Sequence, residues 1–144
     1  MQDDRTPDAL PPLPRPEIDR INAPYWAALR ERRLTFQRCA HGHRWLPPRA
    51  ACPHCLSTSI AWVDAAGGGR LVSWVVYRVA FHDAFKGRLP YNVALVELDE
   101  GPRLITNIRA PHDALRGDAR VRVAFDVEGH GDAAFALARF ELVD

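Results

Sequence analysis

The sequence predicts a mainly β protein with a short N-terminal helix, a small cysteine-containing β module and a C-terminal five-stranded barrel. Three observations support this fold class. Five stretches with largely alternating apolar and polar residues follow the glycine run 67–69, a pattern typical of half-buried strands. Cysteines and histidines cluster between residues 39 and 55. No long stretch carries the 3.6-residue periodicity of a helical protein.

Composition and charge are close to those of average globular proteins. Of 144 residues, 47% are hydrophobic and 26% are charged, as expected for a folded domain. The formal charge is +1, so no charge excess indicates binding to nucleic acid or to a membrane surface. No apolar run reaches the roughly 18 residues of a membrane span, and the acidic start is unlike a signal peptide. We therefore expect a cytoplasmic protein whose three cysteines serve a metal or chemistry rather than disulfides.

Three regions are expected along the chain. Residues 1–20 contain five prolines, which remove backbone donors and predict a disordered, proline-rich leader. Residues 21–64 are expected to form the helix and the cysteine-containing module. Residues 65–144 are expected to form the barrel.

The predicted helix covers residues 23–32. Asn22 can cap it, and Tyr25, Trp26 and Leu29 follow at helical spacing. A helix this short is marginal on its own. Its two large aromatic side chains therefore either complete the core of this chain or dock on a partner.

Two short turns between strands 34–38 and 60–63 are predicted to hold one zinc ion. Cys52 and Cys55 form a C-x-x-C pair, which lets two thiolates approach one ion. Cys39 supplies a third ligand, and a histidine two or four residues later can supply the fourth. This is the layout of a zinc ribbon.

Such a zinc site is expected to be structural. Four protein ligands leave no open position for water, and a ribbon this small needs its ion in order to fold. A redox pair is disfavoured because no βαβ pattern surrounds the C-x-x-C pair. Three free cysteines without a metal remain the alternative.

The C-terminal strands fit a small closed barrel of the OB (oligonucleotide/oligosaccharide-binding) type. One helical turn is predicted at 111–115, before the fourth strand, and a small β-sandwich is the alternative. The five predicted strands are 70–80, 92–98, 103–108, 119–127 and 133–142.

Several motifs in this order resemble a known family. They are Ala-Pro-Tyr-Trp at 23–26, Gln-Arg-Cys at 37–39, Pro-Pro-Arg-x-x-Cys-Pro-His-Cys at 47–55 and Pro-Tyr-Asn-Val-Ala-Leu-Val-Glu-Leu at 90–98. Over about residues 20–144 the chain is similar to the OB-fold, acyl-CoA-associated zinc-ribbon proteins filed as domain of unknown function thirty-five. The resemblance implies an N-terminal helix, a rubredoxin-like zinc ribbon and an OB-fold.

The resemblance also implies a function. Members of this family sit beside thiolases, lipid-transfer-protein-like thiolase homologues or hot-dog hydratases. They act there as partner subunits that support acyl-CoA chemistry, including steroid side-chain degradation. We therefore expect a non-catalytic accessory subunit, which binds such an enzyme and contacts no nucleic acid and no membrane.

The first half of the zinc site departs from the family pattern. Family members usually have C-x-x-C-G there, whereas this chain has Cys-Ala-His-Gly-His at 39–43. Matching the Gly-His pair places His41 at the position of the missing cysteine. The predicted zinc ligands are therefore Cys39, His41, Cys52 and Cys55, with His43 as the second choice for the fourth ligand.

The loop at 81–91 is long for a small barrel and supplies candidate contacts to acyl-CoA. Basic side chains there can bind phosphate, and aromatic rings can stack on adenine. The candidates are Phe81, Lys86, Arg88 and Tyr91.

Two other functions remain open from the sequence. OB-folds and zinc ribbons also bind single-stranded nucleic acid, but acidic residues interleave with the arginines of this barrel. An enzyme would need an acid–base pair, and the adjacent pairs at 82–83 and 112–113 need not meet in space.

Overall fold

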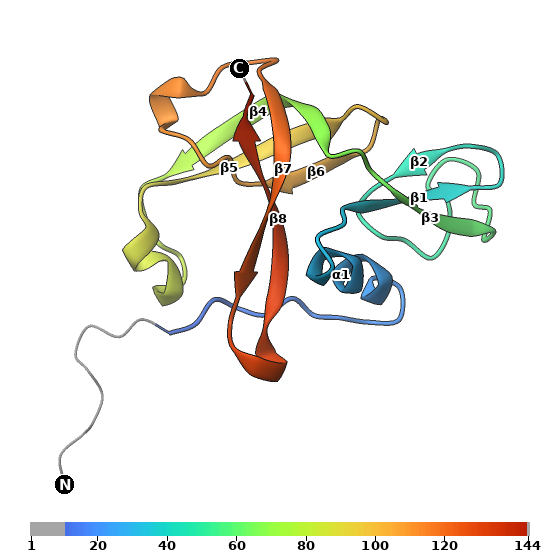
Figure 1. Ribbon diagram of the computed structural model, residues 1–144, viewed down its shortest axis with the longest axis horizontal. Helices are drawn as coiled ribbons and strands as arrows, with labels where there is room; N and C mark the ends of the chain where they lie inside the picture. Colours follow the sequence, from blue (N-terminus) through green and yellow to red (C-terminus); the bar gives the residue numbers. More distant parts are fainter. Residues whose placement is uncertain (1–10, 144) are drawn as a thin grey trace, which may run out of the picture.

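The computed structural model describes residues 11–143 and contains one α-helix, three short 3-10 helices and eight strands (Figure 1). The elements in chain order are α1 Ala23–Arg30, β1 Thr35–Cys39, β2 Arg44–Trp45, β3 Ile60–Asp64, β4 Gly68–Tyr77, η1 Asp83–Arg88, β5 Tyr91–Leu98, β6 Arg103–Thr106, η2 His112–Ala114, β7 Arg120–Glu128, η3 Gly131–Ala133 and β8 Phe135–Leu142. In the described part of the chain, no helix has both the length and the apolarity to span a bilayer.

The five C-terminal strands form one curled antiparallel sheet, a half-barrel that matches the OB-fold. Their order is β6-β5-β4-β7-β8, and β7 and β8 cross in front of the other three strands in Figure 1. Side chains of β5 alternate strictly between half-buried and buried, because one face of the sheet lines the core. The mainly β fold class, the short helix and the OB architecture predicted from the alternation are confirmed.

The two edges of this sheet meet at one parallel bridge between Ile108 and Phe140. The Phe140 amide donates to the Asn107 carbonyl at 3.0 Å, and the Arg109 amide donates to the Phe140 carbonyl at 2.8 Å. Asn92 holds this segment from inside the sheet. Its side chain donates to the Ile108 carbonyl at 2.8 Å and accepts from the Ile108 amide at 2.7 Å, which satisfies a buried polar group.

Helix α1 packs against β8 and β1, between the curled sheet and the ribbon (Figure 1). Leu29 of α1 and Leu34 before β1 are buried in the same apolar core as Phe140. Tyr25 and Trp26 are half-buried against that core, and burial raises the pKa of Tyr25 to about 12. The ribbon and the half-barrel therefore share one core, to which both aromatic side chains of the helix contribute.

Two local expectations differ from the structure. Asn22 does not cap α1, because its side-chain oxygen accepts from the Asp19 amide at 2.8 Å instead. The glycine run 67–69, which from the sequence alone is a hinge or a tight turn, instead enters the sheet, because Gly68 and Gly69 begin β4. A Cβ at Gly69 would lie 2.5 Å from the Glu97 carbonyl oxygen, so this close approach of two strands requires glycine.

The predicted leader is described only in part. Residues 1–10 lie outside the described residues. Residues 11–19 have no regular secondary structure, and in Figure 1 they cross the lower part of the β7–β8 hairpin, above its turn, on the way to α1. Leu13 and Pro16 are half-buried there.

The ribbon is a three-stranded antiparallel sheet with the order β2-β1-β3. The buried Gln37 fastens the loop after β2 to β1: its side-chain oxygen accepts from the Trp45 indole at 2.7 Å and from the Arg49 amide at 2.6 Å. This loop leads directly into the Cys52 turn, so Gln37 helps to hold the second half of the candidate metal site opposite the first.

Candidate functional site

Two hairpin-like turns bring four potential metal ligands together at the end of the ribbon. The ligand atoms of Cys39, His43, Cys52 and Cys55 all lie within 4.8 Å of one another. Cys39 and Cys52 are buried, His43 is half-buried and Cys55 is exposed. The Cys39 and Cys52 side of the cluster therefore faces the interior of the ribbon, and the Cys55 side faces solvent.

The separations between these atoms fit a tetrahedral zinc ion. Zn–S bonds of about 2.3 Å and Zn–N bonds of about 2.0 Å place ligand atoms roughly 3.5–3.8 Å apart. The Cys39 and Cys55 sulfurs are 3.8 Å apart. The Nδ1 atom of His43 lies 3.4 Å from the Cys39 sulfur and 3.6 Å from the Cys52 sulfur. Three thiols and one imidazole also match the ligand chemistry that zinc favours.

The structure groups His43, rather than His41, with the three thiols. The Cys39 amide donates to the His43 carbonyl at 3.0 Å, so these two residues face each other across a three-residue turn and place their side chains on one face. Gly42 adopts φ +88°, the left-handed conformation that such a turn requires. His41 lies in the turn, where its Nδ1 is 3.4 Å from the Cys55 sulfur but outside the group of four.

Local hydrogen bonds favour the thiolate of Cys39, whereas the neighbouring thiols disfavour the thiolate of Cys55. Burial would raise the pKa of Cys39, but the backbone amides of His41 and His43 and the His43 side chain outweigh it and lower the pKa to about 6. At Cys55, an interaction with the Ser57 backbone lowers the pKa, but partial desolvation and the neighbouring Cys52 and Cys39 thiols outweigh it and raise the pKa. Three thiolates this close repel one another, and a bound cation offsets that repulsion.

A His43→Ala variant is therefore expected to lose more zinc than a His41→Ala variant. Removing His43 leaves three protein ligands, whereas removing His41 leaves the group of four intact. The measurement is elemental analysis of both variants, purified without chelator. Zinc lost from His41→Ala and kept in His43→Ala would assign the fourth ligand to His41.

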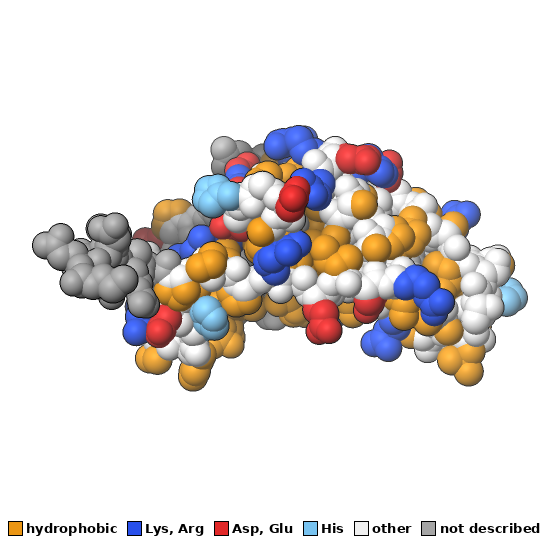
Figure 2. Space-filling model, turned by 90° about the horizontal axis from the view of Figure 1, so that it is seen from below, with side chains coloured by type: hydrophobic (Ala, Val, Ile, Leu, Met, Phe, Trp, Pro, Cys, Tyr) orange, Lys and Arg blue, Asp and Glu red, His pale blue; other side chains and the backbone are white. Residues whose placement is uncertain are grey.

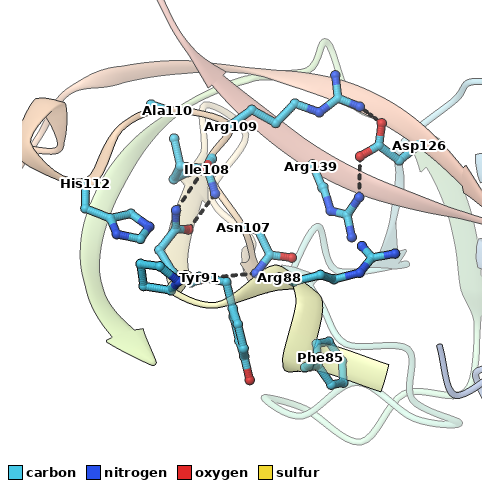
Figure 3. A pocket seen from close by; sticks show the side chains of 12 residues that line it. Phe85, Arg88, Tyr91, Asn107, Ile108, Arg109, Ala110, His112, Asp126 and Arg139 are labelled. Carbon is cyan, nitrogen blue, oxygen red and sulfur yellow. Dashed lines mark hydrogen bonds and ion pairs between the residues drawn. The ribbon is translucent and has the colours of Figure 1, made fainter. Parts of the chain in front are cut away.

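A second site candidate is a pocket of about 350 Å³ beside η1, at the end of the half-barrel (Figure 3). It is lined by side chains from η1, β5, β7, β8 and the segment after β6. They are Phe85, Arg88, Pro90, Tyr91, Asn92, Asn107, Ile108, Arg109, Ala110, His112, Asp126 and Arg139.

Of the four loop residues predicted from the sequence, the pocket collects Arg88 and Tyr91 only. Tyr91 lies in an aromatic cluster, 5.3 Å from the Tyr77 ring and 5.3 Å from the Phe85 ring. Phe81 is 83% exposed and lies outside the pocket lining. Lys86 is also outside it, and its ammonium group pairs with Asp83 at 2.9 Å.

The guanidinium groups of the pocket already have carboxylate partners. Arg88 binds both oxygens of Glu128, at 3.3 and 3.2 Å, and Arg139 contacts Asp126 and Glu128. Arg109 also contacts Asp126 (Figure 3). Burial would raise the pKa of Glu128, but Arg88 and Arg139 outweigh it and lower the pKa. An anion entering the pocket would have to compete with these carboxylates.

Sequence reasoning missed most of this lining. Asn107, Arg109 and Arg139 come from segments far from the 81–91 loop, so no local motif marks them. Asn92 could have been found from the sequence, because it is a polar residue at an inward-facing position of β5, where the other inward-facing residues are apolar.

Family models match both halves of the chain. The description "ChsH2, rubredoxin-like zinc ribbon domain" matches residues 26–61. The description "ChsH2, C-terminal OB-fold domain" matches residues 62–126. The two matches are consecutive and meet between β3 residues 61 and 62.

Two curated proteins are similar to this chain. One is the "Probable enoyl-CoA hydratase alpha subunit" of Thermomonospora curvata, 46% identical over 108 residues, covering 74% of this chain and 33% of that protein. The other is a "DUF35 domain-containing scaffold protein" of Pyrococcus furiosus, 35% identical over 85 residues, covering 58% of this chain and 62% of that protein. The match thus spans about a third of the hydratase subunit and less than two thirds of the scaffold protein.

One solved structure matches nearly end to end. A chain of the "Ltp2-ChsH2(DUF35) aldolase" superposes with a TM-score of 0.76 at 38% identity, covering 89% of this chain and 98% of that one. Together with the two consecutive family matches, this shows that the chain belongs to the ChsH2 (DUF35) family, with a rubredoxin-like zinc ribbon followed by an OB-fold.

Proposed function

We propose that this chain is a non-catalytic accessory subunit, which binds an enzyme of the thiolase-fold, lipid-transfer-like or hot-dog hydratase type and supports acyl-CoA metabolism. The observation that carries the proposal is the near end-to-end match, at 38% identity, to the DUF35 chain of an aldolase. The similarity to a hydratase alpha subunit supports the same role. A cytoplasmic location is part of the proposal, because the site needs reduced thiols.

The arrangement of polar side chains supports a role without independent catalysis. The His82 ring accepts a hydrogen bond from the Ala84 amide at 3.0 Å, while Asp83 pairs with Lys86. The two neighbours in sequence therefore have separate structural partners. The candidate metal site has four protein ligands, so a zinc ion there would be structural, with no open position for a substrate or an activated water.

The proposal includes a contact to the CoA ester at the pocket beside η1. Arg88 can exchange Glu128 for a phosphate of CoA, because guanidinium groups bind both anions in the same forked geometry. Tyr91 and Phe85 offer aromatic faces for the adenine base. Phe81 and Lys86, at the exposed part of the loop, stay candidates for a further contact.

Single-stranded nucleic acid is the alternative ligand, and the charge distribution disfavours it. On the face shown in Figure 2, blue basic and red acidic side chains are interspersed. Two arginines of the half-barrel illustrate this: Arg70 pairs with Glu97 at 3.2 Å, and Arg120 pairs with Asp99 at 2.8 Å. Phosphate neutralisation, which supplies most nonspecific affinity, needs an unpaired basic surplus.

The test is co-elution in size-exclusion chromatography with a candidate enzyme subunit encoded beside this chain. Trp26 lines three hollows of the surface, and large aromatic residues are favoured interface anchors. Trp26→Ala is therefore expected to weaken the complex strongly, measured as loss of co-elution. It is expected to lower the melting temperature of the lone chain only slightly. The control is Trp62→Ala, which removes another half-buried tryptophan.

Two results would count against this account. If wild-type chain and enzyme elute separately, the accessory role is contradicted. If Trp26→Ala leaves the complex intact but sharply lowers the melting temperature, Trp26 belongs to the core alone.

A further inference from the structure

Strand β4 has an open edge along its second half. It pairs with β5 along most of its length but with β7 only at residues 68–70. Leu71 makes the last bonds on the β7 side: its amide donates to the Ala119 carbonyl at 2.9 Å and its carbonyl accepts from the Asp118 amide at 2.8 Å. Within residues 11–143, the backbone from 73 to 77 has no hydrogen-bond partner on that side.

The register identifies the backbone groups on this edge. A β-bulge lies between Leu71 and Ser73, and two residues of a bulge oppose one residue of the neighbouring strand. Beyond it, Trp74 and Val76 are less exposed than their neighbours and share the inward direction of Leu71. Residues on one face of a strand direct their N–H and C=O groups to the same edge. Trp74 and Val76 therefore present both groups on the open edge.

This edge lacks the features that protect edge strands. Natural edges carry charges, prolines or bulges that block pairing. Residues 71–77, Leu-Val-Ser-Trp-Val-Val-Tyr, contain no charge, proline or glycine, and the bulge lies at the start of the open part rather than within it. Val75 is 56% exposed and Tyr77 is 36% exposed. A segment with this composition is prone to strand pairing.

We propose that the β4 edge pairs with the same edge of a second copy of this chain, antiparallel about a two-fold axis at Val75. In this register Val75 faces Val75 of the second copy, and Ser73 faces Tyr77. Arg78, the first residue after β4, is the nearest charged residue to this axis, and in this register it faces the uncharged bulge. No like charges oppose each other, so the segment is self-complementary, as an interface with two-fold symmetry requires.

The pairing joins β6-β5-β4 of both copies into one continuous sheet. On its outer face, exposed or half-buried apolar side chains follow one another from β6 to the end of β4. They are Ile105, Leu95, Val93, Val75 and Tyr77. The dimer brings the two apolar faces side by side. This assembly goes beyond the accessory role and does not depend on it.

The experiment is sedimentation of the full chain over a range of concentrations. Wild type is expected to form a dimer, while Val75→Arg and Val75→Glu are each expected to be monomeric, because like charges then meet at the axis. Mixing the two variants is expected to restore a dimer. The control is Val127→Arg on β7, where the apolar side chain is 71% exposed but lies away from this edge, so its dimer should persist.

Hydrogen exchange identifies the paired groups. The amides of Trp74 and Val76 are expected to gain protection as the dimer forms. A wild-type chain that stays monomeric up to hundreds of micromolar would overturn the proposal, as would a dimer that Val127→Arg breaks and Val75→Arg does not. Protection that appears only after an enzyme subunit is added would also overturn it and would assign the edge to a strand of that enzyme.

Discussion

A Cys52→Ser variant is expected to lose most of its zinc and the fold of the ribbon, while β4–β8 stay folded. Cys52 is completely buried and packs in a small apolar cluster with Cys39 and Trp45. So small a cluster contributes little packing at the end of the ribbon that carries the two turns, and the ion is expected to hold that end together. In zinc-finger peptides a structural zinc contributes about 10–16 kcal/mol at neutral pH, so removing one buried thiolate should have a large effect.

The expected result is measured in two ways. The zinc content, measured by elemental analysis, should fall from about one zinc per chain to a small fraction of that value. Hydrogen exchange should accelerate at β1–β3 but remain slow at β5. The matched control is His54→Ala, which changes an exposed residue of the same turn that lies outside the group of four ligands. The account would be contradicted if Cys52→Ser kept one zinc, or if wild type contained no zinc and still had a protected ribbon.

The strands of the half-barrel could be predicted from the sequence because their pattern is local. Each strand exposes alternate residues to the core, so burial is recorded in the order of residues along the chain, as in β5. The way in which the barrel closes could not be predicted. It depends on Asn92 holding the Ile108 backbone and on Leu29 joining the core from the helix, and both contacts join distant segments.

The metal site could be predicted as far as its three cysteines, and the family resemblance favoured His41 as the fourth ligand. Backbone geometry favours His43. When the third residue of a three-residue turn is a glycine in the left-handed conformation, the two residues that flank the turn face each other across it. Gly42 places Cys39 opposite His43 in this way. The turn chemistry is therefore a signal for His43, whereas alignment of the Gly-His pair with the family pattern is a signal for His41.

For the pocket beside η1, only lining residues that are close together in the sequence could be predicted. Arg88 and Tyr91 could be predicted as candidates because they share one loop. Arg109 and Arg139 could not, because only the pairing of β8 with the segment after β6 brings them near the loop. Sequence alone also could not show that Arg88 is already paired with Glu128.

The second large effect is expected in enzyme activity. The chain by itself should show no turnover of an α,β-unsaturated acyl-CoA or a β-hydroxyacyl-CoA thioester. His82 and Asp83 have separate structural partners, and the four protein ligands of the candidate zinc site leave no open coordination position. Adding the chain to its enzyme subunit should raise the turnover of that subunit at least about tenfold, equivalent to about 1.4 kcal/mol of barrier. Arg88→Ala should then raise KM for the CoA ester more than it lowers kcat, if the pocket binds CoA phosphates.

The most direct test of the accessory role is therefore one set of three rates: the chain alone, the enzyme subunit alone and the two together, with the same acyl-CoA. The account predicts background turnover for the chain, low turnover for the enzyme subunit and full turnover only for the mixture. Turnover of the acyl-CoA by the purified chain alone would contradict it, as would an enzyme subunit whose rate the chain leaves unchanged.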